Sequence, residues 1–215
     1  MIHLHYYPGN ASLTPHMLLE ELGVPFELEF VDRQVGAHKT PEYRKLNPNA
    51  QIPVMVDGDL VLYETAAILM HLADTHPQAR LAPPLATPER AHYYKWMAWL
   101  TNTLQAALVV YFYPERWVDD GNEEGTRQVK AHAESKIGPM LDQIDAQLAS
   151  HGGPWLLGAD FSALDPYTFM LCRWTRGFAR PARSLPHISP YLQRMLARPA
   201  VQRVLATEKL REPYV

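Results

Sequence analysis

The chain has 215 residues, of which 47% are apolar and 20% charged, with a formal net charge of −3 and a single cysteine. This length fits one large domain or two small ones, and the near-average composition excludes a disordered, collagen-like or coiled-coil chain. The lone Cys172 excludes an intrachain disulfide, an internal CxxC pair and a cysteine-rich zinc site, and the negative net charge argues against general nucleic-acid binding.

No membrane span or export signal is visible in the sequence. The longest apolar run, residues 106–113, is far shorter than the ~20 residues that a membrane span needs. Residues 1–12 lack the basic and apolar regions of an export signal. We therefore expect a cytoplasmic protein that binds no membrane, and a free cysteine fits that reducing compartment.

The first third of the chain alternates strand and helix. Residues 2–7 alternate apolar and polar positions, which predicts a strand, and Pro8-Gly9-Asn10 indicates a loop. Helical spacing of apolar residues begins at Ser12 and ends at Gly23. Residues 26–30 then alternate phenylalanine or leucine with glutamate, which predicts a second strand. Such strand–helix–strand units are normally parallel, with a right-handed crossover.

Residues 32–51 are predicted to form an irregular crossing that contains one short helix. Thr40-Pro41 is a favourable N-cap and first-turn pair for that helix, and Asn47-Pro48 ends it. Asp57-Gly58 between the apolar runs 54–56 and 60–62 predicts a hairpin. A further helix runs from Glu64-Thr65 to His76-Pro77, which completes an α/β domain over residues 1–77.

A proline-rich linker over residues 78–87 separates this domain from an all-helical one over residues 88–215. Thr87-Pro88 begins a helix that we expect to continue until Pro114, and a second helix covers about 123–149. Ser162 and Asp165 have the spacing of a capping box before an apolar helix. That helix contains Cys172, which we interpret as a buried core thiol.

Charge is distributed unevenly along the chain. Residues 1–77 hold 10 acidic and 4 basic side chains, whereas residues 173–215 hold 9 basic and 2 acidic ones. The basic stretch is either a solvated helical surface or an electropositive wall that faces an anionic ligand.

Three segments of the first domain carry groups suited to ligand binding. The helix that follows Pro8–Ser12 would direct free N–H groups toward an anion or thiolate, and the Ser12 hydroxyl could face a ligand or only cap the helix. A cis bond before Pro53 would expose the Ile52 backbone to an extended peptide. Glu64 could accept from an ammonium group and Thr65 could donate to a carboxylate, or both could only cap their helix.

In combination, four motifs resemble those of the cytosolic glutathione S-transferases. They are YYPGNASLTPH at 6–16, NPNAQIPVM at 47–55, LYETAAILMHLAD at 62–74 and FSALD at 161–165. The first is most similar to bacterial members related to the beta class. The resemblance covers nearly the whole chain and implies a thioredoxin-like, glutathione-binding domain followed by an all-helical domain.

The resemblance also implies roles for individual residues. Glutathione is the implied cosubstrate, Pro53 the implied cis-proline, and Ser162 with Asp165 the structural capping box. The implied glutathione-binding residues are His38, Lys39, Gln51, Ile52, Pro53, Glu64 and Thr65. Ala11 stands where the beta class has a cysteine, and Gln105 where it has a histidine. The thiolate stabiliser is therefore Ser12, Tyr6, Asn10 or a backbone amide, with Ser12 favoured.

The implied activity is detoxification, by attack of the glutathione thiolate on a small hydrophobic electrophile. The helical domain would contribute the electrophile site through Asn102, Gln105, Tyr111 and Trp117, although the aromatic residues could equally form core or dimer contacts. Glutathione-dependent reduction of peroxides or disulfides, and ligand binding without turnover, are the alternative functions. The resemblance implies a homodimer, and we expect no metal site, because His92 and His132 have no partner at metal-ligand spacing.

Overall fold

A computed structural model describes all residues, 1–215, and the chain divides into two compact units. The first unit comprises residues 1–82 and 196–212, and the second comprises residues 83–195 and 213–215. The first unit therefore includes a C-terminal segment that the sequence reading assigns to the helical domain.

The first unit contains a four-stranded sheet in the order β2-β1-β3-β4. Its strands are β1 (Ile2–Tyr6), β2 (Phe26–Phe30), β3 (Val54–Asp57) and β4 (Leu60–Tyr63). β1 pairs with β2 in parallel, as the intervening helix requires, whereas β1–β3 and β3–β4 are antiparallel. Gly58, with φ 57°, provides the left-handed conformation in the predicted hairpin turn.

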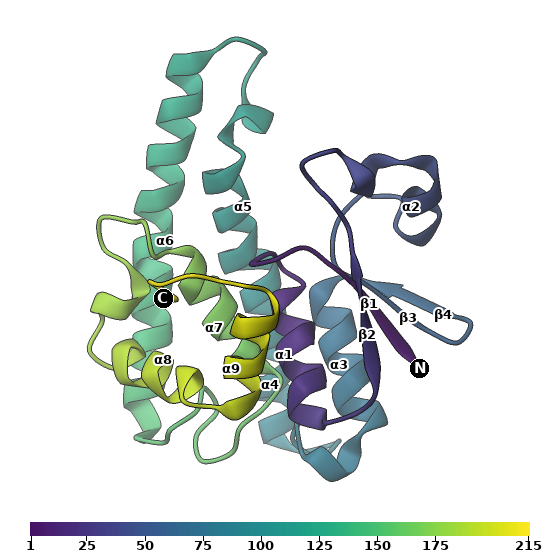
Figure 1. The fold of residues 1–215 in the computed structure, drawn as a ribbon. Helices are drawn as coiled ribbons and strands as arrows, with labels where there is room; N and C mark the ends of the chain where they lie inside the picture. Colours follow the sequence, from purple (N-terminus) through teal and green to yellow (C-terminus); the bar gives the residue numbers. More distant parts are fainter. The chain divides into compact units, whose positions relative to one another are not determined.

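Four helices belong to this unit: α1 (Leu13–Leu22), α2 (Pro41–Leu46), α3 (Thr65–Thr75) and α9 (Pro199–Thr207). Two predicted helix ends are confirmed by their backbone geometry. Gly23 adopts the left-handed conformation, and its N–H donates to the Leu19 carbonyl at the end of α1. The Thr40 hydroxyl accepts from the Tyr43 N–H at the start of α2. In Figure 1, α1 and α3 lie side by side against the sheet, with α9 next to α1.

The two faces of the sheet pack against different helices. Leu4 and Met55 face one another across β1 and β3 and are fully buried on the side that α1 and α3 cover. On the opposite face, Tyr43 of α2 packs in a second apolar cluster with Ile52 and Val54. Because side chains alternate along a strand, His3 and His5 point to this second face.

The basic C-terminal stretch makes specific ion pairs, a result that neither interpretation of its charge anticipates. Arg198 forms a bidentate pair with Glu21 at 2.5 and 2.8 Å, and Arg203 contacts Glu20 at 2.5 Å. These contacts attach α9 to α1 within the first unit. The opposite charges of the two ends of the chain thus serve in part to hold this unit together.

The second unit is helical throughout its regular elements: α4 (Pro88–Trp99), α5 (Ala106–Phe112), α6 (Glu123–His151), α7 (Leu164–Trp174) and α8 (Ile188–Leu196). The chain is helical from Pro88 to Phe112, as expected, but its middle segment, Leu100–Gln105, is π-helical and divides the helix into α4 and α5. α6 is two residues longer than expected and ends at Gly152, which is left-handed. α5 and α6 lie side by side (Figure 1). None of the helices combines the length and apolar character needed to cross a membrane.

Ser162 and Asp165 make the reciprocal contacts of a capping box at the start of α7. The Asp165 carboxylate accepts from the Ser162 N–H at 2.8 Å, and the Ser162 hydroxyl accepts from the Leu164 N–H at 3.3 Å. Asp165 also accepts from the Leu156 N–H and the Tyr191 hydroxyl, which links three segments of this unit. Burial raises the pKa of Asp165 to about 6, although these hydrogen bonds act in the opposite direction.

Candidate functional site

Three of the predicted segments meet at one end of the sheet. Val54, the first residue of β3, pairs with His5 near the end of β1 and with Tyr63 at the end of β4. The residues that precede β3 therefore lie beside those that follow β1 and β4. This register brings together the segments 8–12, 51–53 and 64–65, which are far apart in the sequence.

Ile52 presents unused backbone groups at this end of the sheet. The Ile52–Pro53 peptide bond is cis, as the resemblance implies, and neither the N–H nor the C=O of Ile52 has a partner within the chain. The preceding carbonyl, that of Gln51, is held by the Tyr43 hydroxyl at 2.9 Å and the Asn47 side-chain amide at 3.0 Å. With its own side chain buried, Ile52 offers one donor and one acceptor at a fixed position, as strand-like pairing with an extended peptide requires.

Glu64 has an unusual backbone conformation for a residue other than glycine. Its φ is 73° and its ψ 114°, immediately before α3, and its side chain is exposed without a hydrogen-bond partner. Such a conformation costs of order 1–3 kcal/mol and is concentrated at functional sites. Thr65 follows at the first turn of α3, where free N–H groups and the positive end of the helix dipole favour a carboxylate.

Ser12 occupies a different position from the one expected. Its hydroxyl is fully buried, donates to the Tyr7 carbonyl at 3.2 Å and lies 3.2 Å from the Tyr7 N–H, from which it accepts. It makes no capping bond to α1. Ser12 therefore closes the turn between β1 and α1, and its only proton is committed to the backbone.

Asn10 and Tyr6, the other two candidates for stabilising a thiolate, differ in their surroundings. Asn10 is half-buried, and its carbonyl oxygen accepts from the Ala11 N–H at 2.5 Å, which leaves the amide N–H groups of its side chain without a partner. Tyr6 packs edge-on against His16 and Phe30. Burial and, next, the charge of Glu208 raise the pKa of Tyr6, so its hydroxyl stays protonated.

Glu208 is a residue of this region that sequence reasoning missed. Its carboxylate accepts from the Gly9 N–H at 2.8 Å and contacts His16 Nδ1 at 2.8 Å, and the side chains of both Glu208 and His16 are buried. Glu208 follows α9, 199 residues along the chain from Gly9. The sequence offers one signal for Glu208, an acidic residue within a basic stretch, but only the fold identifies Gly9 and His16 as its partners.

The expected cationic part of the site lies in a short 3-10 turn, Ala37–Lys39, just before α2. Ala37 packs against the apolar cluster that contains Ile52, so the neighbouring His38 and Lys39 lie on the same side of the sheet as that residue. Lys39 and Gln51 are exposed. Tyr7, which the sequence motifs do not single out, joins the same cluster, and its hydroxyl accepts from the Gln34 side chain at 3.4 Å.

The residues expected to bind the electrophile all belong to the second unit. Asn102 and Gln105 lie in the π-helical segment, a feature that is frequent at functional sites. Asn102 is exposed, whereas the Gln105 side chain accepts a hydrogen bond from the Tyr167 hydroxyl. Tyr111 packs against Phe178 at 4.3 Å between ring centroids, and Trp117 is 61% exposed. Gln105 and Tyr111 thus contribute to packing within this unit.

A thioredoxin-like mixed sheet followed by a helical unit is the architecture of glutathione transferases. Residues 2–74 match the family model "Glutathione S-transferase, N-terminal domain", and residues 106–208 match "Glutathione S-transferase, C-terminal domain". A relative from Escherichia coli O157:H7, glutathione S-transferase GstA, is 31% identical over 97% of this chain and 99% of its own. The chain belongs to the glutathione S-transferase family.

Solved structures agree with this assignment over nearly the full length. A glutathione transferase homologue from Sulfitobacter, solved with bound glutathione, superposes with a TM-score of 0.88 at 28% identity, covering 98% of this chain and 99% of its own. A bacterial beta class glutathione S-transferase from Sphingomonas chungbukensis has a TM-score of 0.82 at 27% identity, covering 97% and 100%.

Proposed function

We propose that this protein is a glutathione transferase, which binds glutathione in its first unit and activates the thiol for attack on a small hydrophobic electrophile. The observation that carries the proposal is the free backbone N–H and C=O of Ile52, at the same end of the sheet as Glu64 and Thr65. Glutathione is a short peptide with an amino-acid group at one end and a carboxylate at the other, so it needs all three kinds of contact.

Each part of glutathione has a chemically matched group in the first unit. The Ile52 backbone pairs with the cysteinyl residue, Glu64 accepts from the γ-glutamyl ammonium, and the Thr65 hydroxyl and N–H donate to the γ-glutamyl carboxylate. Lys39, with His38 and Gln51, meets the glycyl carboxylate. The unusual backbone conformation of Glu64 supports this assignment. The side chain makes no capping hydrogen bond to α3, so its carboxylate is free to accept from a ligand.

The thiolate requires modest stabilisation from the turn between β1 and α1. A thiol pKa of about 8.5 must fall by roughly two units for substantial ionisation at neutral pH, which requires ~2.7 kcal/mol. One hydrogen bond to a charged group contributes ~1.5–3 kcal/mol, and a helix N-terminus adds ~0.3–1 kcal/mol. We assign the donor role to the Asn10 side-chain amide and the N–H groups at the start of α1, and a positioning role to Ser12, because the Ser12 proton already binds the Tyr7 carbonyl.

We further propose that the protein is a beta-related member that works without a protein thiol at the active site. Ala11 stands at the position implied for the class cysteine, and Cys172 is buried in α7, where burial raises its pKa to about 12. The likeness to the Sphingomonas beta class enzyme supports the class. Homodimer formation and electrophile binding by Asn102, Gln105, Tyr111 and Trp117 remain part of the proposal, and sedimentation of the purified protein tests the first.

Retention on immobilised glutathione, followed by turnover of a substrate panel, tests the function. We expect retention by the wild type, loss of retention in Glu64→Gln, and no change in the control Glu42→Gln, which alters an exposed glutamate in the first turn of α2. Turnover of aryl halides or unsaturated carbonyls supports the transferase. Turnover of only hydroperoxides or disulfides favours a reductase, and retention without any turnover favours a binding protein.

The pH dependence of the transferase rate separates the thiolate candidates. Asn10→Ala should raise the apparent pKa of bound glutathione. Ser12→Ala should chiefly lower stability, because it leaves the Tyr7 N–H without a partner, whereas the Tyr7 carbonyl still accepts from the Asn10 N–H. A raised pKa in Ser12→Ala and none in Asn10→Ala would contradict the assignment and restore Ser12 as the donor.

A further inference from the structure

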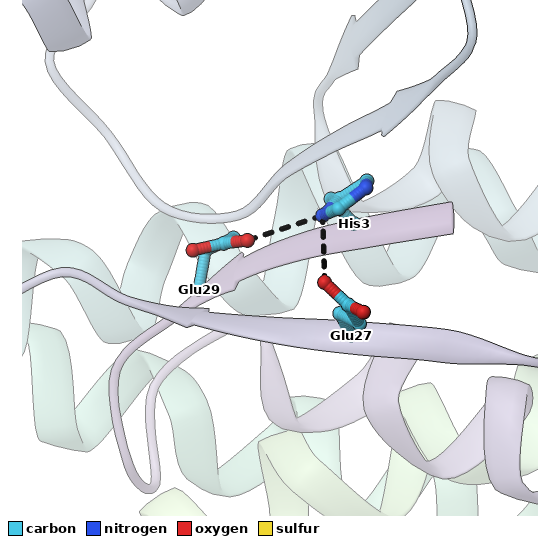
Figure 2. Close-up of side chains that lie close together, drawn as sticks. All are labelled: His3, Glu27 and Glu29. Atoms are coloured by element: carbon cyan, nitrogen blue, oxygen red, sulfur yellow. Dashed lines mark hydrogen bonds and ion pairs between the residues drawn. The ribbon is translucent and has the colours of Figure 1, made fainter. Parts of the chain in front are cut away.

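One histidine and two glutamates form a compact group on the second face of the sheet, apart from the glutathione-binding end. His3 on β1 pairs in register with Glu27 on β2, and Glu29 follows two residues later on the same face. The single atom His3 Nδ1 lies 3.1 Å from Glu29 Oε1 and 3.5 Å from Glu27 Oε2 (Figure 2). The donor atoms of all three residues lie within 4.8 Å of one another.

These separations match those of a metal coordination sphere. Zinc binds histidine nitrogen at 2.0–2.1 Å and carboxylate oxygen at 2.0–2.2 Å, so neighbouring donors of a tetrahedral site are roughly 3.3 Å apart. The two separations from His3 Nδ1, 3.1 and 3.5 Å, lie on either side of that value. The separation between the Glu27 and Glu29 oxygens is at most 4.8 Å, so rotation of the exposed glutamate side chains would bring all three donors to one ion.

The charge of the group also favours a divalent cation. Glu27 and Glu29 carry two negative charges on one face of one strand, and His3 is the only partner of either carboxylate. A neutral imidazole leaves a charge of −2, and a protonated one leaves −1, whereas a divalent ion neutralises both carboxylates. The side chains of His3, Glu27 and Glu29 are 36%, 54% and 46% exposed, so an ion can reach them from solvent.

We propose that His3, Glu27 and Glu29 form a binding site for a divalent first-row transition metal, with zinc as the best fit. An imidazole together with carboxylates suits zinc, cobalt and nickel, whereas magnesium and calcium prefer oxygen donors alone. Three protein ligands leave room for water in the fourth position. His5, the register neighbour of Glu29 on the same face, packs edge-on against Tyr43 and lies outside the group of three donors.

The inference is independent of the proposed function, because no residue of the group belongs to the glutathione site. His3 is four residues before Tyr7, which corresponds to about 13 Å along an extended strand. Retention on immobilised glutathione should therefore be the same with zinc or with a chelator. This separates a failure of the metal proposal from a failure of the transferase proposal.

Calorimetric titration of the tag-free protein with zinc chloride tests the site directly. We expect one saturable site in the wild type, at least tenfold weaker binding in His3→Gln, Glu27→Gln and Glu29→Gln, and no competition from excess magnesium. The matched control is His187→Asn, which removes the ion pair of the exposed His187 Nδ1 with Asp145 Oδ2 at 2.9 Å, a histidine with one carboxylate instead of two. Cobalt absorption in the visible range provides a second readout of ligation in the same variants.

Weaker zinc binding in the three variants supports the proposal, provided that the control is unchanged and the cobalt spectrum is lost in parallel. Equal affinity in the Glu27→Gln variant, an equal loss in His187→Asn, or displacement of zinc by magnesium would each overturn it. Because none of the four positions is buried, circular dichroism should report the same fold throughout.

Discussion

Replacement of Glu208 by alanine should destabilise the first unit strongly, although the residue lies close to the C-terminus of the chain. The carboxylate makes two contacts of 2.8 Å, with the Gly9 N–H and with His16 Nδ1, and its side chain has no exposed area. Two hydrogen bonds to a charged group contribute ~1.5–3 kcal/mol each, which gives ~3–6 kcal/mol. Loss of one partner of a buried pair costs ~3–5 kcal/mol, in agreement.

Thermal and urea unfolding measure this loss. For a chain of this size, 1 kcal/mol corresponds to ~2–4 °C in Tm, so Glu208→Ala should lower Tm by roughly 10 °C. Glu208→Gln keeps an acceptor for the Gly9 N–H and should lose about half as much. The control Glu212→Ala removes an exposed carboxylate four residues later and should leave Tm unchanged.

A double-mutant cycle with His16→Ala isolates the pair itself. If Glu208 acts through His16, the double variant should lose less stability than the sum of the two single variants. A loss below ~1 kcal/mol in Glu208→Ala, or strict additivity with His16→Ala, would refute the reasoning. Transferase activity should fall as well, because Gly9 belongs to the turn that we assign to the thiolate.

Three further predictions concern other parts of the chain. Glu64→Gly should abolish glutathione retention and raise Tm by a few degrees, because relief of ~1–3 kcal/mol of backbone strain exceeds the ~0.5–1 kcal/mol entropic cost of glycine. Glu64→Ala should also lose retention, but without the gain in Tm. A lower Tm for the glycine variant than for the alanine variant would contradict the strain argument. The pKa of Asp165 is raised from 3.8 to about 6 in the folded chain, so the stability that this residue contributes is fully present below pH 3.8 and is lost as the pH rises through 6. Urea titrations should show the wild type losing ~3 kcal/mol of stability relative to Asp165→Asn over this range. Parallel pH profiles of the two proteins would disprove this prediction. The buried Cys172 should not react with a thiol reagent in the native protein and should react once per chain after denaturation; rapid native labelling would contradict its assignment as a core thiol.

Local chemistry explains why much of the fold was predictable. Gly23, Thr40-Pro41 and Asp57-Gly58 each act through their own backbone or through a neighbour within four residues, so a short stretch of sequence contains the whole signal. The π-helical segment 100–105 carries no such signal. Its sequence continues the helical pattern of residues 88–113, and no residue type within it marks the change to π-helical hydrogen bonding.

The candidate site was predictable in composition but not in the arrangement of hydrogen bonds. Glu64, Thr65 and Ile52 stand where their motifs indicate, because strand ends and helix starts define their positions. The hydroxyl of Ser12 turned back to the Tyr7 backbone, a choice between two nearby acceptors that no spacing reveals. Glu208 depends on a contact across almost the whole chain, and such a contact exists only once α9 has packed against α1.

The register of β1 with β2 connects both proposals to one structural cause. Helix α1 returns the chain for a parallel pairing, in which His3 lies opposite Glu27 and His5 opposite Glu29. In the sequence, the spacings His-x-His and Glu-x-Glu indicate only strands with one polar face, because side chains alternate along a strand. In register they become one group of metal-ligand type. A shift of one residue would turn the glutamates to the face covered by α1 and α3, so the placement of this group depends on the register of β1 with β2.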